Sequence, residues 1–104
     1  MSHVTNIAFI RAKPGRCEDL VARLLALVAP SRQEAGCINY DVHHSLDDGE
    51  LCCVYENWRS AEDLAAHFQR PHMQAFAADL PALIEGDLDL RGFSMVSRPE
   101  PWRL

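Results

Sequence analysis

Several features that would direct an interpretation are missing from this sequence of 104 residues. No apolar run approaches the roughly 20 residues that a membrane-spanning helix needs, and no basic stretch followed by an apolar one marks a signal peptide near residue 1. The 10 Lys and Arg are outnumbered by 15 Asp and Glu and do not cluster, so the net charge is −5 and a basic footprint for nucleic acid is absent. We therefore expect a cytoplasmic protein that binds neither nucleic acid nor membrane.

The cysteines also lack any Cys-x-x-Cys spacing, and in a reducing cytoplasm we expect them to be free thiols, mostly packed in the core. His43, His44, Cys52 and Cys53 lie on two segments that we predict to pair as strands. Adjacent strand residues point to opposite faces, so at most one His and one Cys reach a given side, short of the about four ligands of a closed zinc site. We expect no metal, and no nucleotide-binding motif or other cofactor signature is present.

What the sequence has is an ordinary globular composition, 48% hydrophobic and 24% charged. This length supports a single domain over residues 1–104. Residues 98–104, which include two prolines and Trp102, are expected to form a tail that packs on the body or on a partner.

Apolar periodicity predicts four strands and two interrupted helices. The strands are expected at 4–12, 37–45, 51–58 and 87–97, and the helices at 16–35 and from Ser60 to about Ile84. Pro30 should kink the first helix in its last turns, and Gly36 is the expected glycine after its end.

Local signals place the remaining boundaries. Leu46–Gly49 contains Asp-Gly and predicts a hairpin turn. Ser60 has the spacing of a helix cap, and Pro71 suits the first position of a restarted helix. A change of phase at Arg91-Gly92 suggests a bulge in the last strand.

The order strand, helix, strand, strand, helix, strand is that of the ferredoxin-like α+β fold, with a four-stranded antiparallel sheet under two helices. The first strand is apolar on both faces: Val4, Ala8 and Ile10 on one, Ile7 and Phe9 on the other. Helices can cover one face only, so we expect a homodimer formed sheet against sheet to cover the other.

Four short motifs, in this order, carry a resemblance to a known family. They are Lys13-Pro14-Gly15, Glu34-Ala35-Gly36-Cys37-Ile38-Asn39-Tyr40, Tyr55-Glu56-Asn57-Trp58 and His67-Phe68-Gln69-Arg70-Pro71-His72-Met73. Together they resemble the antibiotic biosynthesis monooxygenase (ABM) family, which includes quinol monooxygenases, over nearly the whole chain.

This resemblance implies a dimeric α+β barrel with a pocket between sheet and helices in each subunit. It also implies an oxidoreductase that oxidises a quinol or polyphenol-type aromatic substrate with O₂ and uses no metal, flavin or haem. Other proteins of this fold bind or degrade haem, or isomerise or bind small metabolites, and both alternatives stay open because fold alone does not fix function.

His67 is the first candidate for catalysis. It lies on the second helix beside Phe68, near the expected pocket wall, and an imidazole with an ordinary pKa can remove a phenolic proton. A deprotonated phenol is electron-rich enough to reduce O₂ without a cofactor. Under the haem alternative, His67 would instead be the axial ligand.

Trp58 and Asn6 complete the catalytic set that the resemblance implies. Trp58 would form an aromatic wall against a planar substrate, although plain core packing is the alternative. Asn6 is a polar residue in an apolar strand, and a buried amide there needs partners. It could donate to a substrate or superoxide oxygen, provided that it faces the helices.

Tyr40, Glu56, Phe68 and His72 are the expected substrate-binding residues. Glu56 shares a strand face with Trp58 and, if buried, would have a raised pKa or orient a His. The interpretation that we favour for Glu56 is an ion pair at the dimer interface with Arg11 or Arg91. His72 follows Pro71 and is expected at the surface or at the pocket mouth.

Overall fold

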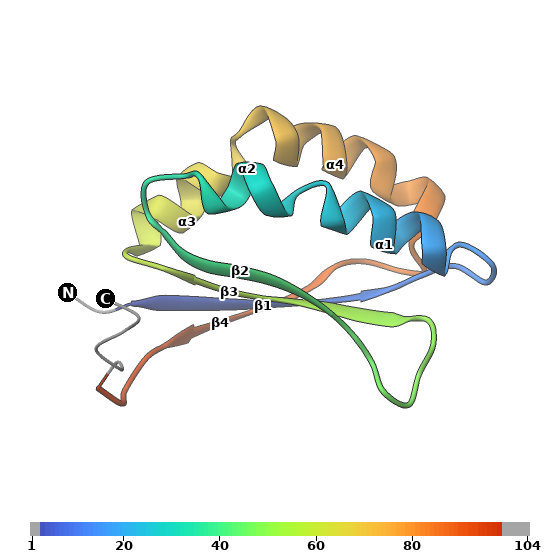
Figure 1. Ribbon diagram of the computed structural model, residues 1–104, viewed down its shortest axis with the longest axis horizontal. Coiled ribbons are helices and arrows are strands. Elements are labelled where there is room, and N and C mark those ends of the chain that lie inside the picture. Colours follow the sequence, from blue (N-terminus) through green and yellow to red (C-terminus); the bar gives the residue numbers. More distant parts are fainter. Residues whose placement is uncertain (1–2, 99–104) are drawn as a thin grey trace.

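In the computed structural model, which describes residues 3–98, four helices lie on one face of an antiparallel sheet (Figure 1). The elements are β1 (Val4–Arg11), α1 (Cys17–Leu25), α2 (Val28–Arg32), β2 (Cys37–His44), β3 (Leu51–Trp58), α3 (Ala61–Phe68), α4 (Pro71–Leu83) and β4 (Asp89–Ser94). The strand order β2-β3-β1-β4 confirms the predicted ferredoxin-like fold. Within the described residues, no helix is long and apolar enough to cross a membrane.

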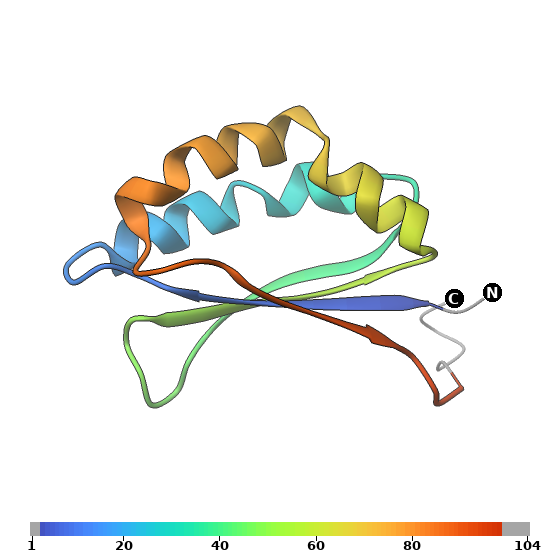
Figure 2. The same cartoon turned by 180° about the vertical axis from the view of Figure 1, so that it is seen from behind.

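Alternation along the strands decides which side chains meet the helices. On β1, Asn6, Ala8 and Ile10 are buried toward the helices, whereas Ile7 and Phe9 lie on the other face and are half-buried. The view from behind shows the same layering, with helices on one side of the sheet only (Figure 2). The inner layer of the sheet is closed by β3 and β2 side chains, namely Cys52, Val54, Glu56, Trp58 and Tyr40.

The first predicted helix is split into two. α1 ends at Leu25 and α2 begins at Val28, so the interruption precedes Pro30 rather than kinking the last turns. Pro30 has no N–H for the carbonyl of Ala26, four residues earlier, and its ring crowds that carbonyl. The chain therefore breaks at Ala26, which becomes the C-cap of α1.

Gly36 does not serve as the glycine that ends a helix, because α2 already ends at Arg32 and Gly36 lacks a positive φ. Its role is a close approach: a Cβ built on Gly36 would collide with the side chain of Asp63 on α3. The backbone carbonyl of Gly36 also accepts a hydrogen bond from the Arg59 amide at 2.9 Å. Gly36 thus lets the start of α3 lie directly against the connection between α2 and β2.

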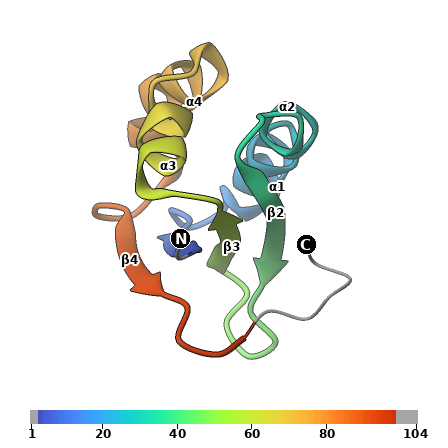
Figure 3. The ribbon, with the colours of Figure 1, turned by 90° about the vertical axis from the view of Figure 1, so that its left-hand side faces the viewer.

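The second helical segment begins and restarts where the sequence predicts. The Ser60 hydroxyl accepts a hydrogen bond from the Asp63 amide at 3.1 Å and caps α3. Pro71 stands at the start of α4, and Pro81 lies in its last turn. After the break α4 packs against α1, and the end-on view shows α3 and α4 side by side with α1 and α2 (Figure 3).

The last strand corrects the prediction of a bulge. β4 pairs with β1 in one unbroken register from Val4↔Ser94 to Phe9↔Asp89, with Gly92 opposite Asn6. The change of phase in the sequence arises because Phe93 belongs to the outer face, which is itself apolar. The predicted tail from 98 onward, with Trp102, lies outside the described residues except for Arg98.

Candidate active site

The site is built around a carboxylate that receives three cationic or imidazole side chains. Glu34, between α2 and β2, accepts from His67 Nδ1 at 2.8 Å and from His72 Nε2 at 3.0 Å. Arg70 Nε lies 3.4 Å from its other oxygen. Glu34 is almost wholly buried and His67 is fully buried. No pattern in the sequence marks Glu34 as a site residue, although it stands in one of the motifs that carry the family resemblance.

The pairing with Glu34 sets the protonation of His67. Burial lowers the pKa of His67, and the hydrogen bond to Glu34 works in the opposite direction without cancelling it. The ring is therefore neutral at pH 7. Because a carboxylate only accepts, the proton of the neutral ring lies on Nδ1, and Nε2 is left as a free acceptor.

Aromatic rings hold the imidazole of His67 in place. Its ring centroid lies 4.6 Å from that of Trp58, 5.5 Å from Tyr40 and 5.4 Å from Phe68. These contacts enclose the ring on the sheet side and the helix side. His67 therefore has a fixed orientation, with Nδ1 toward Glu34 and Nε2 toward the interior of the sheet.

Glu56 lies on that interior side. Its Oε1 accepts a hydrogen bond from the Trp58 indole at 2.9 Å and lies 3.9 Å from His67 Nε2. Burial raises the pKa of Glu56 to about 7, and the charge of Glu34 adds to this, whereas the Trp58 indole and the nearby Asn6 amide lower it. Near neutral pH, Glu56 can thus give up or take a proton beside a neutral imidazole.

Two buried polar atoms near Glu56 have no hydrogen-bond partner among the described residues. They are His67 Nε2 and Asn6 Nδ2. Asn6 is opposite Glu56 in the β1–β3 register, and both line a small internal cavity of about 20 Å³. That volume holds about one water molecule. Buried groups without partners are costly, so the Asn6 amide beside this cavity marks a place where a polar ligand atom would be stabilised.

The rest of the cavity lining is mainly apolar. Tyr40 also borders it, and burial raises the pKa of that phenol, which stays protonated. Leu90 of β4 both lines the cavity and is 46% exposed, so the cavity lies close to the surface at this strand. The remaining lining is contributed mainly by Phe68, Met73, Phe76 and Leu88.

Six of the seven predicted site residues thus fall into two groups, and His72 lies apart from both. Asn6, Tyr40, Glu56 and Phe68 border the cavity. His67 and Trp58 do not border it but lie directly behind Glu56 and contact it. The sequence could not distinguish these two layers, because it predicts which face a side chain occupies but not its depth.

One interpretation is wrong. Glu56 is not in an ion pair on the outer face, because it points toward the helices and is 3% exposed. Within residues 3–98, Arg11 pairs with Asp48 and Arg91 with Asp89 instead.

His72 lies on the outer side of the cluster. Its side chain is 22% exposed, and with Glu34 and Arg70 it borders an open surface groove of about 300 Å³. Hydrogen bonds to Glu34 therefore link His72, at this groove, to His67 in the interior. A larger depression of about 670 Å³ lies between α2 and β2, away from these residues.

The same three residues could also hold a metal ion. One ligand atom from each of Glu34, His67 and His72 lies within 4.8 Å of the others. Two imidazoles and a carboxylate are the ligand types of non-haem iron sites. In the structure these atoms are hydrogen-bonded to one another, so a metal ion would have to replace both contacts with Glu34.

The fold and this buried histidine–carboxylate cluster define an α+β protein with a polar centre between its sheet and its helices. The family model described as antibiotic biosynthesis monooxygenase matches residues 3–79. The chain belongs to this family of monooxygenases, as its motifs implied.

Individual relatives support the same assignment. "Putative monooxygenase Rv0793" of Mycobacterium tuberculosis is 36% identical over 83 residues, which is 80% of this chain and 81% of that protein. The crystal structure of PA3566 from Pseudomonas aeruginosa superposes with a TM-score of 0.88 and 36% identity, covering 93% of this chain and 97% of the other. An uncharacterised Synechocystis protein, sll1783, is 29% identical over 79% of this chain, and the match spans 56% of that protein.

The raised pKa of Glu56 predicts a pH-dependent stability. This carboxyl has a pKa of about 7 in the folded state and an ordinary pKa of 4.5. Its contribution to the free energy of unfolding is therefore complete below pH 4.5 and decreases as the pH rises through 7. The difference corresponds to about 3 kcal/mol. Between pH 5 and pH 8, the free energy of unfolding of Glu56→Gln should therefore rise by about 3 kcal/mol relative to that of the wild type, as measured by urea unfolding.

The exposed Glu62 on α3 offers a matched control. Glu62→Gln should follow the wild-type pH profile. Profiles of Glu56→Gln and the wild type that run parallel from pH 5 to pH 8 would show that Glu56 does not titrate in this range.

Proposed function

We propose that this protein is a cofactor-independent monooxygenase that oxidises a quinol or polyphenol-type aromatic substrate with O₂. The observation that carries the proposal is the pair of unpartnered buried atoms, Asn6 Nδ2 and His67 Nε2, on either side of Glu56. An apolar cavity with a few convergent polar groups and a perturbed carboxyl is the usual form of a small-molecule site.

The proposed chemistry begins with the removal of a phenolic proton. Glu56 borders the cavity and would contact the hydroxyl, and His67 would receive the proton through Glu56 on its free Nε2. Glu34 stabilises the imidazolium that results, as a carboxylate does behind a catalytic histidine. In this assignment His67 is the base, but it acts through Glu56 rather than touching the substrate.

The substrate then supplies all the electrons. Its anion passes one electron to O₂, and the resulting radical and superoxide combine to form a carbon–oxygen bond. The phenolic proton returns from His67 through Glu56 to the peroxide anion and gives a hydroperoxide. Loss of water, which takes the hydrogen of the same carbon, then leaves a carbonyl, so that one oxygen atom is retained and the other leaves as water. Asn6 would donate its free N–H to the developing oxygen anion, which is where such a donor contributes most.

Binding an aromatic ring requires the cavity to widen. At about 20 Å³ it has room for a water molecule only. Phe68, Met73 and Phe76 border it from α3 and α4, and Met73 is an adaptable side chain. We infer that these helices separate from β4 when the substrate enters past Leu90.

The haem alternative fits the observed contacts less well, whereas an isomerase could use the same contacts. As a haem ligand, His67 would have to leave the enclosure formed by Trp58, Tyr40 and Phe68. An isomerase could use the same Glu56–His67 pair for proton transfer, and only the consumption of O₂ separates it from a monooxygenase.

Oxygen uptake tests the proposal. Metal-stripped full-length protein should consume O₂ above the autoxidation background with at least one member of a panel of quinols and anthrones. Because acid–base catalysis contributes about 10²–10⁴-fold, His67→Gln and Glu56→Gln should each lower the rate at least about a hundredfold. Glu62→Gln, on the same helix as His67, should leave it unchanged.

Two results would contradict this function. Uptake that appears only after Fe²⁺ is added would assign the chemistry to a metal held by Glu34, His67 and His72. An absence of uptake across the whole panel would favour the haem or isomerase alternative, to be separated by haem titration.

We further propose that the outer face of the sheet joins a second copy of the chain. The helices leave this face uncovered (Figure 3). It carries Ile7, Phe9 and Tyr55, which are half-buried, and Phe93, which is 52% exposed. A second copy offers the same apolar face, so a two-fold interface would cover both.

Sedimentation equilibrium should then give about twice the monomer mass of 11.7 kDa. Phe93→Glu should shift the protein toward monomer, because a charge would be buried in the interface. Leu25→Glu changes an equally exposed leucine in the helical layer and should remain dimeric. A wild type that is monomeric at micromolar concentration would contradict the interface.

A further inference from the structure

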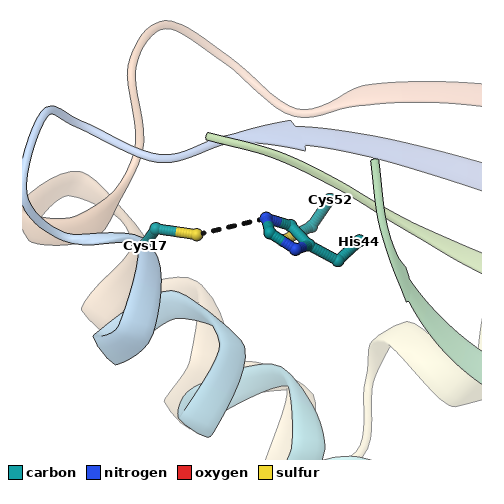
Figure 4. Close-up of side chains that lie close together, drawn as sticks. All are labelled: Cys17, His44 and Cys52. Atoms are coloured by element: carbon teal, nitrogen blue, oxygen red, sulfur yellow. Dashed lines mark hydrogen bonds between the residues drawn. The ribbon is translucent and has the colours of Figure 1, made fainter. Parts of the chain in front are cut away.

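A second cluster of reactive side chains lies at the opposite end of the sheet. Cys17 is the first residue of α1, His44 the last of β2 and Cys52 the second of β3. His44 and Cys52 are direct partners in the β2–β3 register. Figure 4 shows the three side chains converging from these elements, and one ligand atom from each lies within 4.8 Å of the others.

The spacing within the cluster suits a tetrahedral metal centre. Zinc binds sulfur at about 2.3 Å and imidazole nitrogen at about 2.0 Å, so two such ligands at a tetrahedral angle lie about 3.5 Å apart. The Sγ of Cys17 and the Nε2 of His44 are separated by 3.6 Å. Cys17 and His44 therefore need little movement to bind one ion, and the ligand atom of Cys52 lies within 4.8 Å of both.

In the structure, Cys17 Sγ and His44 Nε2 both contact one backbone carbonyl. The Cys17 thiol donates to the Gly49 oxygen at 2.9 Å, and His44 Nε2 lies 2.9 Å from the same oxygen. A metal ion would displace the thiol proton of Cys17, and the neutral ring of His44 would bind through Nε2 with its own proton on Nδ1. Gly49 belongs to the loop between β2 and β3, and a Cβ there would meet nothing within 4 Å, so the loop has room to move.

The cluster also has an entry path. His44 is exposed, Cys17 is half-buried and Cys52 is buried, so the ligands form a one-sided site that opens to solvent. Three protein ligands leave a fourth position for water. Along β3 the cluster is six residues from Trp58, roughly 20 Å at strand spacing, and is therefore separate from the candidate active site.

We propose that Cys17, His44 and Cys52 bind one Zn²⁺ ion, with water in the fourth position. Two thiolates and an imidazole are ligands that zinc prefers, and three of them leave the open position of a non-structural site. The earlier expectation of no metal counted only ligands from the strand pair, and it omitted the thiol that the start of α1 brings to them.

Cobalt is the probe for this site, because Co²⁺ takes the same ligands and its spectrum reports thiolates in a tetrahedral site. Full-length protein, stripped of metal and kept reduced, should bind one equivalent of Co²⁺ with intense tetrahedral bands and a sulfur charge-transfer band. One equivalent of Zn²⁺ should abolish both. Zn²⁺ should also raise the thermal unfolding midpoint, because it binds the folded state.

Variants identify the ligands. Cys17→Ser, Cys52→Ser and His44→Gln should each weaken Co²⁺ binding more than about a hundredfold, since even loss of a ligand's outer partner costs about 10–100-fold. Cys53→Ser and Cys37→Ser remove thiols outside the cluster and should bind as the wild type does. Cys17→Ser and His44→Gln alter accessible residues, so they test the site even where Cys52→Ser fails to fold.

Three results would overturn the proposal. The first is that Co²⁺ gives no thiolate band with the reduced wild type. The second is that the band survives in Cys17→Ser and His44→Gln. The third is that Cys53→Ser removes the band as completely as Cys17→Ser does.

Discussion

The pairing of Glu34 with His67 is the interaction on which the site depends. A carboxylate in the interior must be compensated, and here an imidazole, a second imidazole and a guanidinium surround it. Because the Glu34 carboxylate only accepts hydrogen bonds, it determines which nitrogen of His67 carries the proton. The free nitrogen then faces Glu56, and the raised pKa of Glu56 makes proton exchange between them possible near neutral pH.

The fold brings these groups together through local features of the chain. Pro30 ends α1 early, so that α2 forms a separate helix before the connection that carries Glu34. Gly36 permits the contact with Asp63 that sets α3 against the end of α2, close to Glu34. Ser60 and Pro71 fix where α3 and α4 begin, and thereby place His67 and His72 on the same carboxylate.

Most of the fold could be predicted from alternation and helix signals, because strands with one buried face and capped helices leave regular patterns. The same alternation put Glu56 and Trp58 on one strand face, but it left the face of Asn6 open and did not show that Glu56 meets the helices. The depth of His67 behind Glu56 could not be predicted from alternation, since it depends on how closely α3 lies on the sheet.

Contacts between distant elements explain the other differences. Glu34 stands in a connection without periodicity, so nothing local marks it as the partner of a histidine 33 residues later. Cys17 is likewise far in sequence from His44 and Cys52. Phe93 misled the strand prediction because the outer face is apolar too, which removes the contrast between faces that a register argument needs.

The most direct test of this account is the protonation state of His67 in the folded protein, measured by long-range ¹H–¹⁵N correlation of the imidazole nitrogens. The His67 signals are assigned by their loss in His67→Gln. We expect a neutral ring at pH 7 with the proton on Nδ1, and a midpoint of protonation below the ordinary value of 6.5. A proton on Nε2, or an imidazolium at pH 7, would contradict it.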